Sequence, residues 1–322
     1  MTHNVSIQRR RLIQAAAAAG LGLPAIASLA QAPAASRQLR IGHQKGYLSV
    51  LKGRGILEKR LAPLGVSIKW TEFTAGPVQL EALNVGSIDF GDVGEAPPIF
   101  AQAAGAPLAY VAATVPRPQT EAVLVPKASA IRSVADLKGR KVALNQGSNV
   151  HYFLVKLLEK HGLAYGDVQV VFLPPADARA AFEKNAIDAW VIWDPFRASA
   201  ELALDARLLA DARDVVNNRG YYFSSLPYAD KNRDVIQVLI EEINQLDQWG
   251  AAHKGELAAE LSQVWGLPRA VGEAAVSRTE FGVGPITKAI LAEQQQIADT
   301  FFALKLIPKK INVLEAAAAG IA

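Results

Sequence analysis

GSIDFGDVGEAP, residues 86–97, holds the pattern that decides the fold, because NAIDAWVIWDP, residues 185–195, repeats it. In each stretch an Ile-Asp pair begins a short predicted strand that follows a predicted helix. Five residues after the Asp comes a small or aromatic residue, then an acid, and then Pro within two positions. A chance match over so few positions is the alternative. The repeat predicts two similar α/β lobes, in which Asp89 and Asp188 are structural.

The sequence around both stretches alternates strands with helices, which is typical of parallel sheets covered by helices. Strands are predicted at 39–42, 66–73, 108–113, 122–125, 141–144 and 168–173, and helices at 56–61, 76–85, 97–104, 150–161, 177–184, 235–252, 257–264 and 286–302. We assign residues 38–122 plus 225–322 to lobe I and residues 123–224 to lobe II. Ligands of open α/β sheets bind beyond the carboxyl ends of the strands, so two facing lobes predict a ligand cleft between them.

Residues 1–32 are predicted to be a signal peptide. Three arginines at 9–11 precede an apolar, Ala-rich stretch at 12–29, and small-residue A-x-A sites follow at 25–27 and 30–32. A transmembrane anchor is the alternative, but the uninterrupted apolar length is shorter than the roughly 20 residues that a span needs. The arginines also resemble a twin-arginine export signal. We therefore expect a soluble exported protein.

Composition excludes several classes of protein. The 322 residues are 51% hydrophobic and 20% charged, so the chain is neither disordered nor collagen-like. The absence of Cys excludes thiol catalysis and thiolate metal sites. The net charge of +4 comes mostly from residues 1–32, and without those three arginines 31 basic residues face 30 acidic ones. A nearly neutral mature chain gives no electrostatic reason to expect nucleic-acid or membrane binding.

The sequence carries no catalytic signature. It has no GxSxG, HExxH or GxxxxGK[ST] motif, and its five histidines are scattered without metal-ligand spacing. No pair of acids is identified as catalytic by its spacing. We therefore expect no catalytic residue, no metal and no cofactor.

The turn Asn145-Gln146-Gly147-Ser148-Asn149-Val150-His151 joins a predicted strand to a predicted helix. First-turn N–H groups and the helix dipole favour an anion there, although an ordinary capped helix has the same sequence features. A second such turn contains Gly76. Neither turn contains Lys or Arg, so neutral donors would hold the anion. The predicted ligand contacts are Gln146, Ser148, Asn149 and His151 in the first turn and Gly76 in the second.

Five further residues are candidates for the cleft wall. Gln44 follows the first strand and offers a neutral donor, whereas Lys45 beside it has the features of a solvated surface residue. Glu95 is a candidate acceptor or counter-charge, and its alternative role is that of a surface acid. Trp193 is a candidate aromatic wall or a core residue, and Asp194 is a candidate acceptor. Tyr222 either lines the cleft or packs at the hinge.

Taken together, these segments resemble the periplasmic aliphatic-sulfonate-binding proteins of ABC importers. The matching stretches are IGHQKG (41–46), LEALNVGSID (80–89), PPIFAQAAG (97–105), VADLKG (134–139), PADARAAF (175–182), WDP (193–195), VWGLP (264–268) and PKK (308–310). The resemblance covers essentially the whole mature chain in order. It implies a two-lobe type II periplasmic binding protein that closes on its ligand. It also implies that the sulfonate lies near Ser148 and Asn149, with the organic tail toward Glu95 and Trp193.

The sequence departs from the family at two points. His43 stands where an aromatic residue is frequent, and residues 91–95 differ from the commoner Ser/Thr-Gly-Asp type of loop. An acid at position 95 would favour sulfonates that carry a cationic amine. The hypothesis is that Glu95→Gln weakens zwitterionic sulfonates more than simple alkanesulfonates.

The sequence thus predicts a monomeric periplasmic protein that delivers organosulfonates to an inner-membrane ABC permease and its ATPase, without catalysis. Taurine, nitrate or a thiamine precursor is the alternative ligand. An exported hydrolase or desulfonating enzyme is the alternative class. The effector domain of a transcription regulator is disfavoured by the export signal and by the lack of DNA-binding helices.

Overall fold

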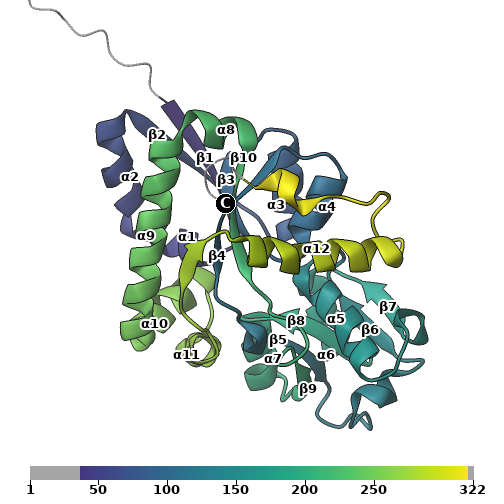
Figure 1. The fold of residues 1–322 in the computed structure, drawn as a ribbon. Coiled ribbons are helices and arrows are strands. Elements are labelled where there is room, and N and C mark those ends of the chain that lie inside the picture. The colour runs from purple at the N-terminus through teal and green to yellow at the C-terminus, as the bar shows by residue number, and fades with distance from the viewer. Residues whose placement is uncertain (1–36, 318–322) are drawn as a thin grey trace, which may run out of the picture. The chain divides into compact units, whose positions relative to one another are not determined.

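The computed structural model describes residues 37–317, so the predicted signal peptide at residues 1–32 lies outside the described residues. The described residues contain two mixed sheets with helices on both faces of each (Figure 1). We call the part built on the six-stranded sheet the first lobe and the part built on the five-stranded sheet the second lobe. This architecture confirms the predicted two-lobe α/β fold.

The first lobe has the strand order β11-β4-β10-β3-β1-β2. Its strands are β1 (Arg37–His43), β2 (Val66–Glu72), β3 (Phe90–Gly94), β4 (Leu108–Thr114), β10 (Gly220–Ser225) and β11 (Val283–Pro285). β1 pairs in parallel with β2 and β3, whereas β10 runs antiparallel between β3 and β4. Four of the six strands therefore point the same way.

The second lobe repeats this plan with the order β7-β6-β8-β5-β9. Its strands are β5 (Glu121–Val125), β6 (Lys141–Leu144), β7 (Gln169–Phe172), β8 (Ala189–Trp193) and β9 (Arg207–Asp211). The antiparallel strand β5 lies between β8 and β9, as β10 lies between β3 and β4. Each lobe thus receives its antiparallel strand where the chain arrives from the other lobe.

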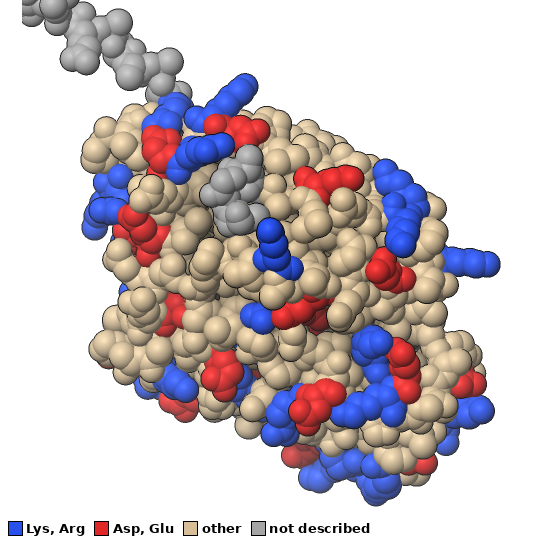
Figure 2. Space-filling model, in the orientation of Figure 1, with Lys and Arg blue, Asp and Glu red and all other residues tan. Residues whose placement is uncertain are grey.

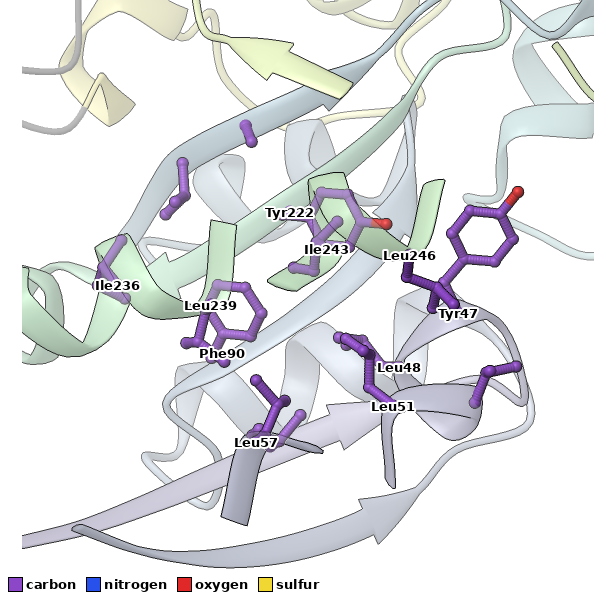
Figure 3. Close-up of a cluster of buried hydrophobic side chains, with 14 of the residues drawn as sticks. Tyr47, Leu48, Leu51, Leu57, Phe90, Tyr222, Ile236, Leu239, Ile243 and Leu246 are labelled. Atoms are coloured by element: carbon purple, nitrogen blue, oxygen red, sulfur yellow. The ribbon is translucent and has the colours of Figure 1, made fainter. Parts of the chain in front are cut away.

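Helices cover both faces of each sheet. They are α1 (Tyr47–Arg54), α2 (Ile56–Leu61), α3 (Gly76–Asn84), α4 (Pro97–Ala103), α5 (Asn149–Lys160), α6 (Pro175–Glu183), α7 (Phe196–Ala203), α8 (Leu226–Lys231), α9 (Arg233–Ala252), α10 (Lys254–Trp265), α11 (Arg269–Ser277) and α12 (Lys288–Ala303). In the first lobe, α1, α2, α9 and α10 pack on one face, and α3, α4 and α12 pack on the other. Figure 3 shows the first of these cores, with Phe90 and Tyr222 among aliphatic side chains of α1 and α9.

The repeated Ile-Asp pairs have the predicted structural role. The Asp89 carboxylate accepts from the backbone N–H of Arg40 at 2.9 Å, and the Asp188 carboxylate accepts from that of Lys141 at 2.7 Å. In return, the N–H of each Asp donates to the carbonyl of the same partner. Each Asp therefore ties the residue that precedes its own strand, β3 or β8, to the neighbouring strand, β1 or β6.

The chain crosses between the lobes after β4 and again after β9. The first crossing lies between the end of β4 at Thr114 and the start of β5 at Glu121. The second differs from the predicted boundary, because β10 was expected to end lobe II and instead pairs with β3 and β4 in the first lobe. The difference arises because β10 fills the position between β3 and β4, and local sequence does not specify which sheet a strand completes.

Charged side chains of both signs lie interspersed over the face drawn in Figure 2.

Within residues 37–317, no helix combines the length and the apolar character needed to cross a membrane.

Candidate functional site

A cavity of about 670 Å³ lies between the two lobes. Its wall comes from the loops that follow β1, β2 and β3 in the first lobe and β6, β7 and β8 in the second. All six loops stand at the carboxyl ends of their strands, the position at which open α/β sheets bind ligands. Both chain crossings and the loop after α10 complete the wall.

Six of the ten predicted ligand contacts line this cavity. They are Gln44 and Gly76 in the first lobe and Ser148, Asn149, Trp193 and Asp194 in the second. The repeat in the sequence and the turn before α5 therefore bring the expected segments together.

The N-terminus of α5 presents neutral donors to the cavity. Gly147 has a φ of 72°, which lets the chain turn sharply before the helix. No side chain caps the helix, and its first turn contains no acid. The Ser148 hydroxyl donates to the carbonyl of Asn145 at 2.7 Å and accepts no N–H of the helix, so its oxygen can accept a hydrogen bond from elsewhere. Unshared first-turn N–H groups at a helix N-terminus form an anion site.

Gln44 and Gly76 shape the wall in the first lobe. The Gln44 side-chain amide donates to the backbone carbonyl of Asp92 at 2.8 Å, which fixes its orientation. A Cβ on Gly76 would lie 2.8 Å from a Pro97 side-chain carbon, so α3 packs against α4 only with glycine here. Gly76 therefore has a packing role in addition to its place in the wall.

Trp193 ends β8 and Asp194 follows it, and the two side chains differ in whether the protein already occupies their polar groups. Trp193 is partly exposed and lies edge-on to Phe196, with ring centroids 6.1 Å apart. The Asp194 carboxylate is already engaged, since it accepts from Arg278 at 3.0 Å and from the N–H of Ala198 at 3.0 Å. Burial raises the pKa of Asp194, and the Arg278 cation opposes that shift. Asp194 is therefore bound to a protein cation on the side away from the cavity.

The lobes touch at one point of the wall. A Cβ on Gly94 would lie 2.8 Å from the Asn149 side chain, so β3 and the start of α5 are in contact. The Asn149 amide also donates to the Asn218 side-chain oxygen at 3.1 Å, in the second crossing. Asn149 therefore joins the first lobe, the second lobe and a crossing.

Four predicted contacts lie outside the lining of this cavity. Gln146 is exposed on the turn, two residues before the helix cap. His151 is fully buried, accepts from the N–H of Gly147 and lies 2.7 Å from the Tyr165 hydroxyl. Burial lowers the pKa of His151 to about 4, so its ring is neutral. It stacks on Phe100 of the first lobe and thus packs between the lobes behind the cavity.

Glu95 and Tyr222 are the other two predicted ligand contacts that lie outside the lining of the main cavity. Glu95 is 3% exposed and accepts from the backbone N–H of Arg219 at 3.1 Å. Burial raises the pKa of Glu95 to about 8. Tyr222 belongs to the core of the first lobe and reaches only a smaller cavity of about 210 Å³, which shares part of its wall with the main one. Glu95 contacts the second crossing and does not line the cavity, so the hypothesis that it meets a ligand amine has no contact to support it.

Sequence reasoning missed three arginines in the wall. Arg117 and Arg219 lie in the two crossings, and Arg179 lies in α6. Each has an acidic partner, namely Asp247 at 3.0 Å, Glu293 at 2.8 Å and Glu183 at 2.8 Å respectively. Only the pairing of Arg179 with Glu183 was visible as an i, i+4 spacing. The other two partners are far away in sequence.

No set of three or more potential metal ligands is gathered in the part of the chain that the structure describes.

The sequence and fold are similar to those of known binding proteins. A family model described as NMT1/THI5 like matches residues 64–248. A protein of Escherichia coli K12 that bears the name of an aliphatic sulfonates-binding protein is 42% identical over 296 residues, which cover 91% of this chain and 92% of that protein. The alkanesulfonate-binding protein SsuA from Xanthomonas axonopodis pv. citri, solved bound to MOPS, matches with a TM-score of 0.83 at 42% identity. That match covers 88% of this chain and 99% of the other.

The solved periplasmic aliphatic sulphonate binding protein SsuA from Escherichia coli matches with a TM-score of 0.81 at 41% identity, over 88% of this chain and 92% of the other. These relatives are named as binding proteins, as the sequence predicted. The cavity between two similar lobes and the identity over nearly the whole described chain agree with one another. The chain therefore belongs to the family of aliphatic-sulfonate-binding proteins, within the wider NMT1/THI5-like group.

Proposed function

We propose that this chain is an exported solute-binding protein that captures aliphatic sulfonates in the interlobe cavity and delivers them to an ABC permease and its ATPase. The periplasm is its place of action, and it acts as a monomer. The mechanism is closure of the two lobes on the ligand, without catalysis.

The observation that carries this proposal is the uncapped N-terminus of α5, which faces the cavity with neutral N–H groups. A sulfonate is a weakly basic, tetrahedral monoanion, so several directed neutral donors suit it. The three wall arginines already have acidic partners, which leaves α5 as the main attraction for an anion. Neutral donors also permit release, which a transport protein needs.

The rest of the cavity suits an organic tail. Phe73, Trp193 and Trp265 line it together with several prolines. Burial of aliphatic carbon contributes about 25 cal/mol per Å², so a short chain adds substantially to affinity. A ligand that touches α5 in one lobe and the strand ends of the other stabilises the closed state over the open one.

Isothermal titration of the mature chain tests the proposal. The panel is butane-1-sulfonate, taurine, MOPS, nitrate and phosphate, in a buffer free of sulfonates because many common buffers are themselves sulfonates. We expect dissociation constants in the micromolar range or tighter for sulfonates, and no heat with nitrate or phosphate. Quenching or shift of Trp193 and Trp265 fluorescence gives an independent readout, since both rings line the cavity.

Silence toward every sulfonate would overturn the ligand assignment while leaving the fold assignment intact. Binding of nitrate or of a thiamine precursor in the same titration would then identify one of the alternative ligands. Release of sulfite or loss of the ligand on prolonged incubation would contradict the absence of catalysis.

A further inference from the structure

The charged side chains that line the cavity are paired, with one exception. The pairs are Lys45 with Glu72, Arg117 with Asp247, Arg179 with Glu183, Asp194 with Arg278 and Arg219 with Glu293. The exception is Asp92, which forms no ion pair within residues 37–317 and lines both the main cavity and the smaller one beside it. Asp92 is therefore the one acid in the wall that has no cationic partner among the described residues.

The Asp92 carboxyl is poorly satisfied by the protein. Its Oδ1 is buried and has no hydrogen-bond partner. The nearby Tyr47 hydroxyl, in the wall of the smaller cavity, is likewise buried without a partner. In Figure 3 Tyr47 lies at one end of the core cluster, with its hydroxyl pointing away from the cluster. Buried polar groups of native proteins are normally hydrogen-bonded, so two such groups in the wall of one cavity indicate a ligand or water that completes them.

The neighbourhood of Asp92 suits a cation. Tyr222 stands directly opposite Asp92 on β10, and Tyr47 lines the same small cavity. Aromatic rings attract cations through their negative faces, and a carboxylate supplies the counter-charge. The cation nearby, Arg117, lies over the Tyr47 ring at 5.5 Å and is already held by Asp247 at 3.0 Å, so the ring of Tyr222 and the Asp92 carboxyl remain for a ligand cation.

Asp92 is also at the right distance from the proposed sulfonate site. β3 places Asp92 two residues before Gly94, which is about 7 Å along a strand. Gly94 touches Asn149 at the start of α5. One short aliphatic chain therefore spans from the α5 N–H groups to the Asp92 carboxylate.

We propose that Asp92 binds the protonated amine of a zwitterionic sulfonate whose sulfonate group lies at α5. This inference rests on the proposed function and narrows it, because it selects ω-aminoalkanesulfonates and related ammonium sulfonates over plain alkanesulfonates. The ligand would then contact an acid in the first lobe and a helix N-terminus in the second, so its two charged ends hold the lobes together.

The test compares 3-aminopropane-1-sulfonate with butane-1-sulfonate by isothermal titration at pH 7.5. The two ligands have the same chain length and differ by an ammonium in place of a methyl group. We expect the natural chain to prefer the amine by about tenfold or more. In Asp92→Asn that preference falls to about twofold or less, while the affinity for butane-1-sulfonate is unchanged or tighter.

Glu95→Gln is the matched control, since it removes an acid close in sequence that lies outside the cavity lining and keeps an oxygen to accept from Arg219. It should leave the ratio of the two affinities unchanged. The ratio in the natural chain also tests the proposal if Asp92→Asn does not fold.

Three results would overturn the assignment. Equal affinities in the natural chain would show that no cation site exists, although the proposed function would stand. If Asp92→Asn keeps the preference for the amine, the cation site lies elsewhere. Failure of both ligands to bind would remove the proposed function and this inference together.

Discussion

Asp92 lowers the stability of the unliganded protein in a pH-dependent way. Burial raises its pKa to about 7, so the folded chain holds this proton more tightly than the unfolded chain does. Stability is therefore lost as the pH rises from about 4 to about 7. Asp92→Asn removes this effect, and we expect it to raise the free energy of unfolding by about 1–3 kcal/mol at pH 8 and by little near pH 4.

Urea unfolding of both proteins across pH 4–8 measures the difference. Asp234→Asn is a control for which we expect the opposite effect on the free energy of unfolding. A hydrogen bond from Arg37 lowers the pKa of this exposed acid, so its ionised form stabilises the folded chain. Its loss should cost a few tenths of a kcal/mol above pH 4. A pH-independent difference for Asp92→Asn would contradict an ionised carboxylate at this site.

The choice between Asp92 and Glu95 also shows where sequence reasoning ends at this scale. The sequence indicated Glu95, after the predicted strand, as the acid at the ligand. The strand runs from Phe90 to Gly94, so Asp92 and Gly94 share one face, and Glu95 lies outside the cavity lining. The acid that we propose for the ligand amine is therefore three residues earlier than the one that the sequence indicated.

The α5 helix is the element on which sulfonate binding depends. Asn149→Asp keeps the size of the side chain, places a negative charge in the first turn beside the proposed sulfonate, and removes the amide that donates to the Asn218 oxygen. An acid there favours the helix dipole by about 0.3–1 kcal/mol, so the helix itself should not be weakened. The same charge repels the anion, and we expect the affinity for butane-1-sulfonate to fall by about tenfold or more.

Titration measures the affinity, and thermal unfolding without ligand measures the stability. Asn185→Asp is the matched control, since this exposed residue lies in a turn of the second lobe away from the cavity lining. Unchanged sulfonate affinity in Asn149→Asp would show that the anion does not lie at α5.

At the scale of helices and strands, local sequence predicted the elements themselves better than the residues that pack against them. The glycine turn before α5, the Ile-Asp pairs and the helix with an early Pro at 76–77 each carry their signal within a few residues, and each is present in the structure. The neighbours of these turns were less predictable. His151 was expected at the ligand because it lies in the turn, but its position in the helix directs it at Phe100 of the other lobe.

At the scale of the whole molecule, the pairing of charges between distant segments is what sequence could not provide. Arg117 pairs with Asp247 and Arg219 pairs with Glu293 only because the crossings bring these residues to the cavity. The same holds for Arg278, which follows α11 and contacts the second lobe. Composition predicted near neutrality, but only the three-dimensional pairing reveals that Asp92 is the acid in the cavity wall without a cationic partner in the described part of the chain.

Arg278 joins the lobes without lining either cavity. It follows α11 of the first lobe and donates to Asp194 at 3.0 Å and to Glu201, both in the second lobe. Its side chain is 18% exposed and that of Asp194 is 7% exposed, so water screens this ion pair only weakly. The contact therefore favours the arrangement of the lobes seen here, and we expect this arrangement to be the closed one.

Arg278→Gln should lower the affinities for 3-aminopropane-1-sulfonate and butane-1-sulfonate by the same factor, about threefold to tenfold, because it acts on the closure equilibrium that both ligands share. The radius of gyration of the unliganded protein, measured by small-angle scattering, should increase. Arg269→Gln, which breaks an exposed pair with Glu273 inside α11, is the control and should change neither quantity. A change in the ratio of the two affinities would mean instead that Arg278 acts on the ligand itself, through the electrostatic potential at Asp194, and unchanged affinities would mean that the bridge does not hold the lobes closed.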